Sequence, residues 1–240
     1  AVIIIDESEA LTDYVSKNFN TKKVVCVRHP FEFNDAYFRD RTDVSNNVSS
    51  TARIAASKRT EIILRLAKQS KKNFEIWGAE KGIYWYHSLK TSPEYDPSFF
   101  KGSWGYYEGE RHGVPYRRNA YDIPCKDSAF CIDLTLFPYG KIYDGGRTQY
   151  SILEAIDCGL IPIGFDVWKD GWDDCYDGVW LPAPKRNGNR YVWEFDEYLR
   201  IIDSAEYSFD MALDNRERMK EVCDLEKIGT EVRELLESAI

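Results

Sequence analysis

The sequence lacks the short motifs that mark several common enzyme classes. No G-x-G-x-x-G pattern follows the first strand-like run, and no P-loop, G-x-S-x-G or H-E-x-x-H pattern occurs in the chain. A dehydrogenase, a kinase or a hydrolase would need one of these patterns or an unfamiliar substitute for it. The sequence therefore argues against all of these classes.

The sequence also has few of the residues that hold metal ions. It contains 3 histidines and no C-x-x-C pair, so we do not expect a structural zinc site. Most of the 6 cysteines lie in apolar stretches, and we expect buried thiols in a reducing cytosol at Cys26, Cys125, Cys131, Cys158, Cys175 and Cys223. In that compartment the sequon at residues 47–49 would have no meaning for glycosylation.

Basic excess and long apolar runs are missing as well. The net charge of −8 argues against a general binder of phosphate backbones, although it leaves room for a local basic site. No apolar run approaches the ~20 residues of a membrane span and no signal peptide is visible, so we expect a cytoplasmic protein without a membrane span. The chain begins without Met in a strand-like run at residues 1–6, which indicates a piece of something longer or a processed start.

The overall composition is that of an ordinary globular protein. The chain has 240 residues, of which 43% are hydrophobic and 30% charged, enough for one large domain or two small ones. Aromatic residues are abundant, with 16 Tyr and 7 Trp. Such rings suit a groove that holds sugars and bases, although a core with scattered surface tyrosines accounts for most of them.

Strand-like and helix-like patterns alternate along most of the chain. Apolar runs predict strands at residues 2–5, 22–27, 48–54, 74–78, 114–117, 131–137, 160–163 and 178–181. Helical spacing predicts helices at residues 9–17, 59–70, 127–130 (as the end of a short helix), 150–158 and from 194 onward. This order predicts an α/β fold, a Rossmann-like, doubly wound, mostly parallel sheet that binds ligands beyond the carboxyl ends of its strands.

Two stretches interrupt the alternation. Residues 31–50 are polar and predict a loop or linker. Residues 79–113 hold many aromatic side chains among Gly and Pro, and we expect them to be irregular. An irregular stretch of this length is typical of a functional loop or an insertion, and a loop that only caps the edge of the sheet is an equal alternative.

A first candidate site lies in residues 50–60, where a strand ends and a helix begins. A helix start offers unpaired N–H groups and the positive end of the helix dipole. Arg53 adds a planar guanidinium and Lys58 a mobile point charge, which together suit a doubly charged diphosphate. The charge pattern alone is also explained by a solvated basic turn.

A second candidate site lies in residues 143–159. The paired glycines Gly145 and Gly146 let the backbone approach a phosphate closely, and the helix that follows directs N–H groups at it. Glu154 lies inside that helix, where a carboxylate can accept hydrogen bonds from ribose hydroxyls. A lone helical Glu usually faces solvent, but the neighbours of Glu154 are apolar, which indicates that it points into the protein.

Together the two candidate sites resemble the C-terminal, donor-binding half of retaining GT-B glycosyltransferases of the family 4-like type. In that family an Arg and a Lys with four residues between them hold the nucleotide diphosphate, and Arg53 and Lys58 have this spacing. A helix carrying L-E-A, followed by C-G and an apolar strand, is the second mark of the family, and residues 153–163 match it. By this resemblance Glu154 binds the ribose of the nucleotide.

The resemblance implies further donor-binding residues. Gly78 lies where the family has a glycine after its second strand, and Arg118 lies in the segment 116–119, where the base would rest against main chain. The loop before the second candidate helix would face the diphosphate with Gly145, Gly146, Arg147 and Thr148.

The chain departs from the family at the expected catalytic acid. A glutamate normally lies eight residues before the ribose-binding one, but that position holds Gly146, so Asp144 is the nearest acid and our catalytic candidate. Residues 147–150 and 113–116 resemble the DNA α-glucosyltransferases of large phages, in which a glutamate stands at the position of Gln149. Both the catalytic carboxylate and the stereochemical outcome therefore stay open.

The resemblance implies an enzyme that transfers a sugar from a UDP- or GDP-linked donor, without a metal or other cofactor. Arg53, Lys58 and Asp144 are its catalytic candidates, and the acceptor is a glycan, a lipid-linked sugar or a modified DNA base. An alternative is a non-catalytic nucleotide-sugar-binding subunit that needs a separate acceptor-binding chain. A sugar-nucleotide 2-epimerase shares the fold, but the histidine and glutamate pattern of that family is not visible.

The resemblance also divides the chain. Residues 1–44 would be the end of an N-terminal domain and a linker, and residues 45–240 the nucleotide-sugar-binding domain. The bulk of the acceptor domain would lie outside this chain, either in a missing N-terminal part or in a partner chain.

Overall fold

A six-stranded sheet forms the centre of the part of the chain that the structure describes. The computed structural model describes residues 2–4, 15–18, 24–52, 54, 58–77, 89–102, 125–135, 137–139, 142–144, 150–169, 175–187 and 190–238. The strands of the sheet are β3 (Asn47–Ser50), β4 (Asn73–Trp77), β5 (Phe100–Gly102), β6 (Phe130–Ile132), β9 (Ile161–Phe165) and β10 (Val179–Leu181). They lie in the order β10-β9-β6-β3-β4-β5, and every neighbouring pair is parallel. The predicted Rossmann-like parallel sheet is confirmed.

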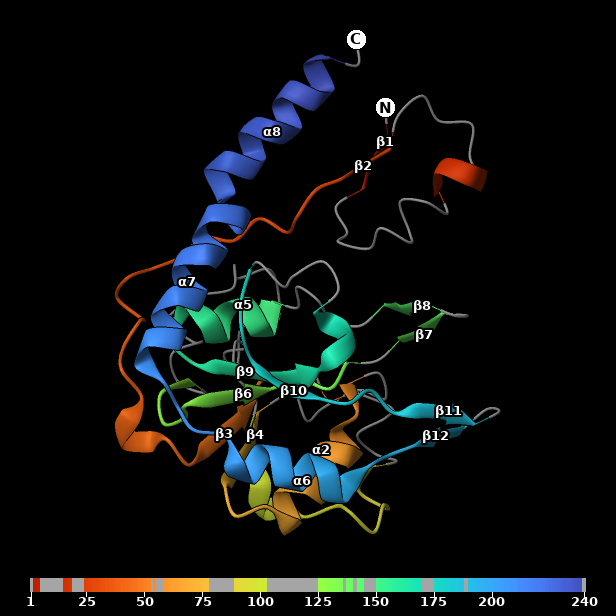
Figure 1. Ribbon diagram of the computed structural model, residues 1–240, viewed down its shortest axis with the longest axis vertical. Helices are drawn as coiled ribbons and strands as arrows, with labels where there is room; N and C mark the ends of the chain where they lie inside the picture. The colour runs from red at the N-terminus through yellow and green to blue at the C-terminus, as the bar shows by residue number, and fades with distance from the viewer. Residues whose placement is uncertain are drawn as a thin grey trace, which may run out of the picture.

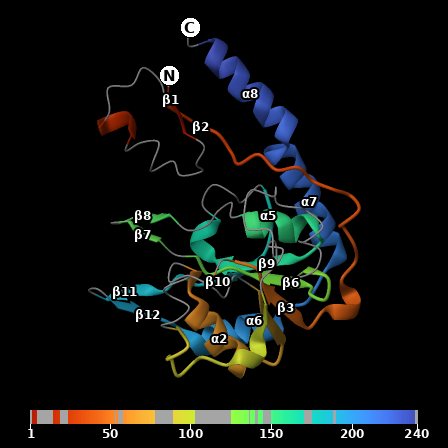
Figure 2. The same cartoon turned by 180° about the vertical axis from the view of Figure 1, so that it is seen from behind.

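Helices cover both faces of this sheet (Figures 1 and 2). Helices α2 (Thr60–Gln69) and α6 (Phe195–Ser204) lie on one face, and α5 (Tyr150–Asp157) lies on the other with α7 (Phe209–Cys223) beside it. Helix α8 (Leu225–Glu237) follows α7 and extends away from the sheet. Short 3-10 helices occur at Thr42–Val44, Pro97–Phe99 and Asp166–Trp168. The helices predicted at residues 59–70 and 150–158 are confirmed to within one residue at each end.

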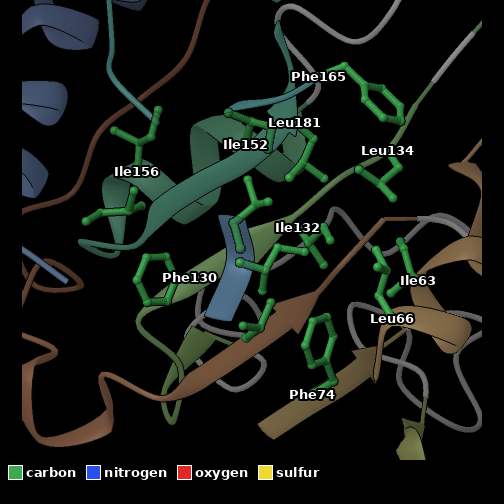
Figure 3. Close-up of a cluster of buried hydrophobic side chains, with 14 of the residues drawn as sticks. Ile63, Leu66, Phe74, Phe130, Ile132, Leu134, Ile152, Ile156, Phe165 and Leu181 are labelled. Carbon is green, nitrogen blue, oxygen red and sulfur yellow. The ribbon is translucent and has the colours of Figure 1, made fainter. Parts of the chain in front are cut away.

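The hydrophobic core fills the space between the sheet and its two helical layers (Figure 3). Figure 3 shows Phe130 and Ile132 of β6 between Ile156 of α5 and Leu66 of α2. All residues of β6 and β9 are buried, as expected for central strands of a parallel sheet that is covered on both faces. Each buried Ile or Phe side chain of these strands contributes about 1.5–3 kcal/mol when it leaves water, so the central strands are firmly held.

Several short elements depart from the sequence prediction. Residues 79–113 were expected to be irregular throughout, but β5 lies within them and pairs with β4 at the edge of the sheet. The end of a short helix was expected at residues 127–130 and one strand at 131–137. The helix end was wrong, because Phe130 belongs to β6. The strand is confirmed only over residues 131–132, because residues 133–135 lie outside any strand and β7 (Phe137–Tyr139) forms a hairpin with β8 (Ile142–Asp144).

A second hairpin was not predicted at all. Strands β11 (Lys185–Asn187) and β12 (Arg190–Val192) pair antiparallel between β10 and α6. Near the start of the chain, β1 (Val2–Ile4) and β2 (Val24–Cys26) form the expected strands, as a separate parallel pair. Residues 15–18 are helical, which confirms the end of the helix expected at 9–17. Residues 9–14 of that helix and the strand expected at 114–117 lie outside the described residues.

The segment that leads into β3 is tied to the far end of α5. The buried Arg41 donates hydrogen bonds from Nε (3.0 Å) and Nη2 (2.8 Å) to the carbonyl oxygen of Cys158, just past the last residue of α5. Tyr207 donates from its hydroxyl to the neighbouring carbonyl of Gly159 at 3.1 Å. The carbonyl groups at the end of α5 are thus satisfied by side chains from two other segments.

Gly159 ends α5 in a conformation that side chains rarely adopt. Its φ is +85°, and a Cβ at this position would lie 2.5 Å from the carbonyl oxygen of Arg39. We expect Gly159→Ala to lower the free energy of unfolding by at least about 1–2 kcal/mol, because a left-handed backbone strains an L-residue and the contact adds to that strain. Urea unfolding would measure the change.

A matched control for this prediction is available in α8. A Cβ added at Gly229 would meet no atom within 4 Å, and this glycine lies in the helix interior. Gly229→Ala is therefore expected to leave stability unchanged or raise it by about 0.5–1 kcal/mol. Equal unfolding midpoints for the two variants would contradict the steric argument.

Candidate functional site

The candidate site lies at the carboxyl edge of the parallel sheet. Asp133 directly follows β6, and Lys58 lies in the connection between β3 and α2. The third part is the first turn of α5, to which Ser151 belongs. In parallel α/β sheets the carboxyl ends of neighbouring strands meet at one edge, which is where such folds bind ligands.

One buried carboxylate joins these three parts. Oδ2 of Asp133 accepts hydrogen bonds from Nζ of Lys58 at 3.2 Å and from Oγ of Ser151 at 2.9 Å. Oδ1 accepts a hydrogen bond from the backbone N–H of Thr135 at 2.8 Å and another from the Thr135 hydroxyl. The Asp133 side chain is fully buried, so its charge depends on these donors and on the ammonium of Lys58.

Lys58 is buried in spite of its charge. Its side chain is 8% exposed, whereas the charged group of a lysine usually reaches water. The next residue, Arg59, begins α2 with a left-handed backbone, at φ 54°. The Arg59 guanidinium lies over the rings of Tyr191 (5.2 Å) and Trp193 (5.8 Å), so the unpredicted second hairpin supports the start of α2.

Glu154 is buried in α5, as its apolar neighbours indicated. It is 6% exposed and lies on the same helix as Ser151, about one turn further along. Its burial agrees with the expectation that it points into the protein. The ribose-binding role is not tested by this geometry and stays a prediction.

The other end of α5 carries a second buried ion pair. Oδ1 of Asp157 accepts hydrogen bonds from Nη2 (2.9 Å) and Nε (3.2 Å) of Arg216, which belongs to α7. The backbone N–H of Asn34 donates to the same carboxylate at 3.0 Å. The side chains of Asp157 and Arg216 are 2% and 3% exposed, so this pair is buried and tied to three segments of the chain.

Most of the other predicted site residues cannot be placed against this centre. Asp144 is the last residue of β8, and the structure describes its backbone only. The remaining predicted residues lie outside the described residues: Arg53, Gly78, Arg118, Gly145, Gly146, Arg147 and Thr148. Lys58 and Glu154 are therefore the predicted donor-site residues whose side chains the structure describes. Lys58 precedes Asp133 in the chain and Glu154 follows it.

Sequence reasoning missed Asp133. The residue lay inside an apolar run that predicted one long strand, and an acid in such a run gives no signal of its own. A signal was present in Asp133 and Thr135, because an Asp two residues before a Thr favours a local side-chain turn that ends a strand.

Cys131 lies beside this centre, and burial raises the pKa of its thiol to about 12, although the hydrogen bond with Thr51 acts in the opposite direction. The reactive form of cysteine is the thiolate, so a pKa raised from 9.0 to about 12 lowers its population at pH 8 by about 10³-fold. We expect iodoacetamide to label Cys131 at least 10³-fold more slowly in the folded chain than in urea, as measured by peptide mapping. Equal rates in both states would contradict this.

The described ranges show neither a metal-binding cluster nor a helix that could cross a membrane. No group of three or more His, Cys, Asp or Glu side chains within them is arranged to hold a metal ion. No helix in the same ranges has both the length and the apolar character that crossing a bilayer requires.

The sheet order, the helical layers and the site at the carboxyl edge define the class of the fold. It is the Rossmann-like fold of a GT-B C-terminal domain, as the resemblance implied. No family model and no curated protein matches the sequence. Similar solved structures do exist, at low sequence identity, and they show the fold alone.

The similar structures include proteins in complex with UDP. HepE of Anabaena, in complex with UDP and glucose, is 15% identical with a TM-score of 0.63, and the match covers 99% of this chain and 64% of that one. A TarM variant of S. aureus, in complex with fondaparinux, alpha-GlcNAc-glycerol and UDP, is 16% identical with a TM-score of 0.60, covering 98% and 43%. Sucrose-phosphate synthase from Thermosynechococcus elongatus is 14% identical with a TM-score of 0.62, covering 99% and 58%. This chain thus spans roughly half the length of the proteins it is similar to.

Proposed function

We propose that this chain binds the donor of a glycosyltransferase, which moves a sugar from a nucleotide diphosphate to an acceptor. One observation carries the proposal. Lys58 and the start of α5, which belong to the two predicted diphosphate-binding stretches, meet on the carboxylate of Asp133 at the carboxyl edge of the sheet. The fold shared with HepE, whose structure holds UDP and glucose, supports the same assignment.

The chemistry of transfer explains why these groups are needed. The bond between the anomeric carbon of the sugar and a diphosphate oxygen breaks, and negative charge develops on the leaving diphosphate. A fixed ammonium and fixed N–H groups stabilise that charge most when they are preorganised in a dry site. The buried Lys58 and the first turn of α5 supply both kinds of group, and Arg53 and the loop 145–148 would add to them. The charge is then stabilised by the protein itself, and we propose no metal or other cofactor.

The finer assignments follow from the resemblance and are part of the proposal. The enzyme is a retaining hexosyltransferase, Glu154 binds the ribose, and Asp144 is the candidate acid beside the sugar. The donor is UDP- or GDP-linked. The acceptor is a glycan, a lipid-linked sugar or a modified DNA base, and it is held by another domain or by a partner chain.

A non-catalytic binding subunit is the weaker proposal. Two of the similar structures are named as enzymes, an O-GlcNAc transferase and a sucrose-phosphate synthase, which favours the enzyme. A partner chain is still reasonable, because a similar chain occurs in the GtfA/B complex, at 16% identity and a TM-score of 0.61, covering 98% of this chain and 45% of that one.

Titration calorimetry with UDP, GDP and ADP tests the proposal directly. We expect one diphosphate to bind, and a donor carrying the same nucleotide to be consumed when an acceptor is supplied. Binding of a diphosphate without any sugar transfer, in the chain alone or in the longer protein that contains it, would favour the subunit. If none of the diphosphates binds, the proposed function is wrong.

A further inference from the structure

We propose that Asp133 is a positioning residue of the donor site, which holds the Lys58 ammonium in a fixed place relative to the first turn of α5. The inference rests on the proposed function, because it gives Asp133 a task in binding the donor diphosphate. Asp133 acts on the donor through Lys58 and Ser151 and is not itself a ligand of the donor.

The carboxylate of Asp133 is buried and fully hydrogen-bonded. Asp133 has no exposed surface, and an ionised carboxylate in such a place is costly unless it is paired and hydrogen-bonded. Both oxygens of Asp133 are used, and each accepts two hydrogen bonds. A carboxylate in this state has little freedom to move.

The two carboxylate oxygens of Asp133 accept hydrogen bonds from different parts of the chain. Oδ1 is held by Thr135, two residues further along the same loop, which fixes the carboxylate to its own strand end. Oδ2 bridges two other elements, because it accepts from Lys58 before α2 and from Ser151 in α5. Through Oδ2, Asp133 therefore links the carboxyl end of β6 to the segment before α2 and to the first turn of α5.

The position of the Lys58 ammonium depends on its contact with Asp133. A lysine ammonium is a point charge on a flexible stem, so its position at a ligand must be fixed by its surroundings. Asp133 accepts a hydrogen bond from the ammonium at 3.2 Å, which limits where the charge can lie. Held in this way, the charge is placed before the donor arrives, so that binding does not have to order it.

A plain structural role is the competing explanation, and the two make different predictions. Asp133→Asn keeps the size of the side chain but places a neutral amide against the ammonium and the Ser151 hydroxyl. If Asp133 positions Lys58 for the diphosphate, the affinity for UDP, or for whichever diphosphate binds, falls by about 10-fold or more, the scale of a hydrogen bond to a charged group. The affinity for the matching nucleoside, which has no phosphate, changes by less than about 2-fold.

The Lys58→Ala background provides a second readout. Once Lys58 is removed, Asp133→Asn has no ammonium left to position and loses only its contact with Ser151, so it should change the diphosphate affinity by less than about 2-fold. A residue that only supports the fold would lower affinity equally in both backgrounds, since independent effects add. Asp157→Asn is the matched control, because it neutralises the other buried carboxylate that pairs with a cation at α5 and is expected to leave diphosphate affinity unchanged.

Each outcome has a definite meaning. The positioning role is overturned if Asp133→Asn binds the diphosphate like the unaltered chain, if diphosphate and nucleoside lose affinity equally, or if the two substitutions are additive. The proposed function survives all of these results. If the unaltered chain binds no diphosphate, the proposed function and this inference both fail. If Asp133→Asn does not fold, Ser151→Ala decides with the same titrations, because it removes one of the two elements held by Oδ2.

Discussion

Lys58→Ala is expected to lower donor turnover by about 10²-fold or more. In the proposed function Lys58 supplies a preorganised positive charge to the leaving diphosphate, and losing one such transition-state donor typically has an effect of this scale. The ammonium is already held by Asp133 at 3.2 Å in a buried place, so water cannot readily replace it. The measurement is nucleotide release from the donor sugar, in the preparation that shows transfer.

Lys72→Ala is the matched control for Lys58→Ala. Lys72 is also buried, and its Nζ donates to the carbonyl oxygen of Ala205 at 2.9 Å, but it precedes β4 and so lies at the opposite edge of the sheet. Its loss should destabilise the fold without a specific effect on turnover at temperatures where the chain stays folded. Equal turnover in the Lys58 variant and the unaltered protein would show that Lys58 does not contact the leaving group.

Arg216→Ala is expected to give the largest loss of stability, about 3–5 kcal/mol in the free energy of unfolding. The substitution removes the ion pair and both hydrogen bonds that Arg216 gives to the Asp157 carboxylate, whose side chain is only 2% exposed. Removing one partner of a buried ion pair costs far more than the pair contributes to stability, because the other charge is left unpaired. Urea unfolding followed by circular dichroism would measure the loss.

Arg218 gives a control on the same helix. It pairs with Asp214 at 2.8 Å and with Asp177 at 2.9 Å, but both carboxylates are more than half exposed. Exposed ion pairs contribute about 0–1 kcal/mol, so Arg218→Ala should change stability far less than Arg216→Ala. Similar losses for the two variants would mean that burial does not govern the strength of these pairs.

The sequence predicted the sheet because its central strands are long or strongly apolar. Residues 160–163 and 74–78 gave clear strand patterns, since the first strand is buried along its whole length and the second alternates in burial. Residues 59–70 gave a clear helical pattern. The same patterns placed Lys58 and Glu154 correctly, at the start of one helix and inside another. Their roles toward a donor remain predictions.

The parts that escaped prediction are short or depend on distant partners. Strand β5 has three residues, which is too short for a clear periodic pattern, and it is stabilised by pairing with β4. The role of Asp133 depends on Lys58 and Ser151, which come from other parts of the chain. The periodicity of a local sequence does not predict contacts between distant segments, so these contacts can be seen only in the folded structure.

The position of β6 in the sheet has a consequence for how the protein is made. Phe130 of β6 pairs with Val48 on one side and with Ile161 on the other, so neither neighbour is supplied by a nearby hairpin. Pairings between distant segments form slowly, because the entropy of closing a long loop is lost before any stabilising contact forms. On the ribosome, Asp133 emerges well before β9, and its strand cannot be enclosed until that later segment has followed. Lys58 will therefore spend part of synthesis without its counter-charge, and the cluster around Asp133 will be completed late in the folding of the chain.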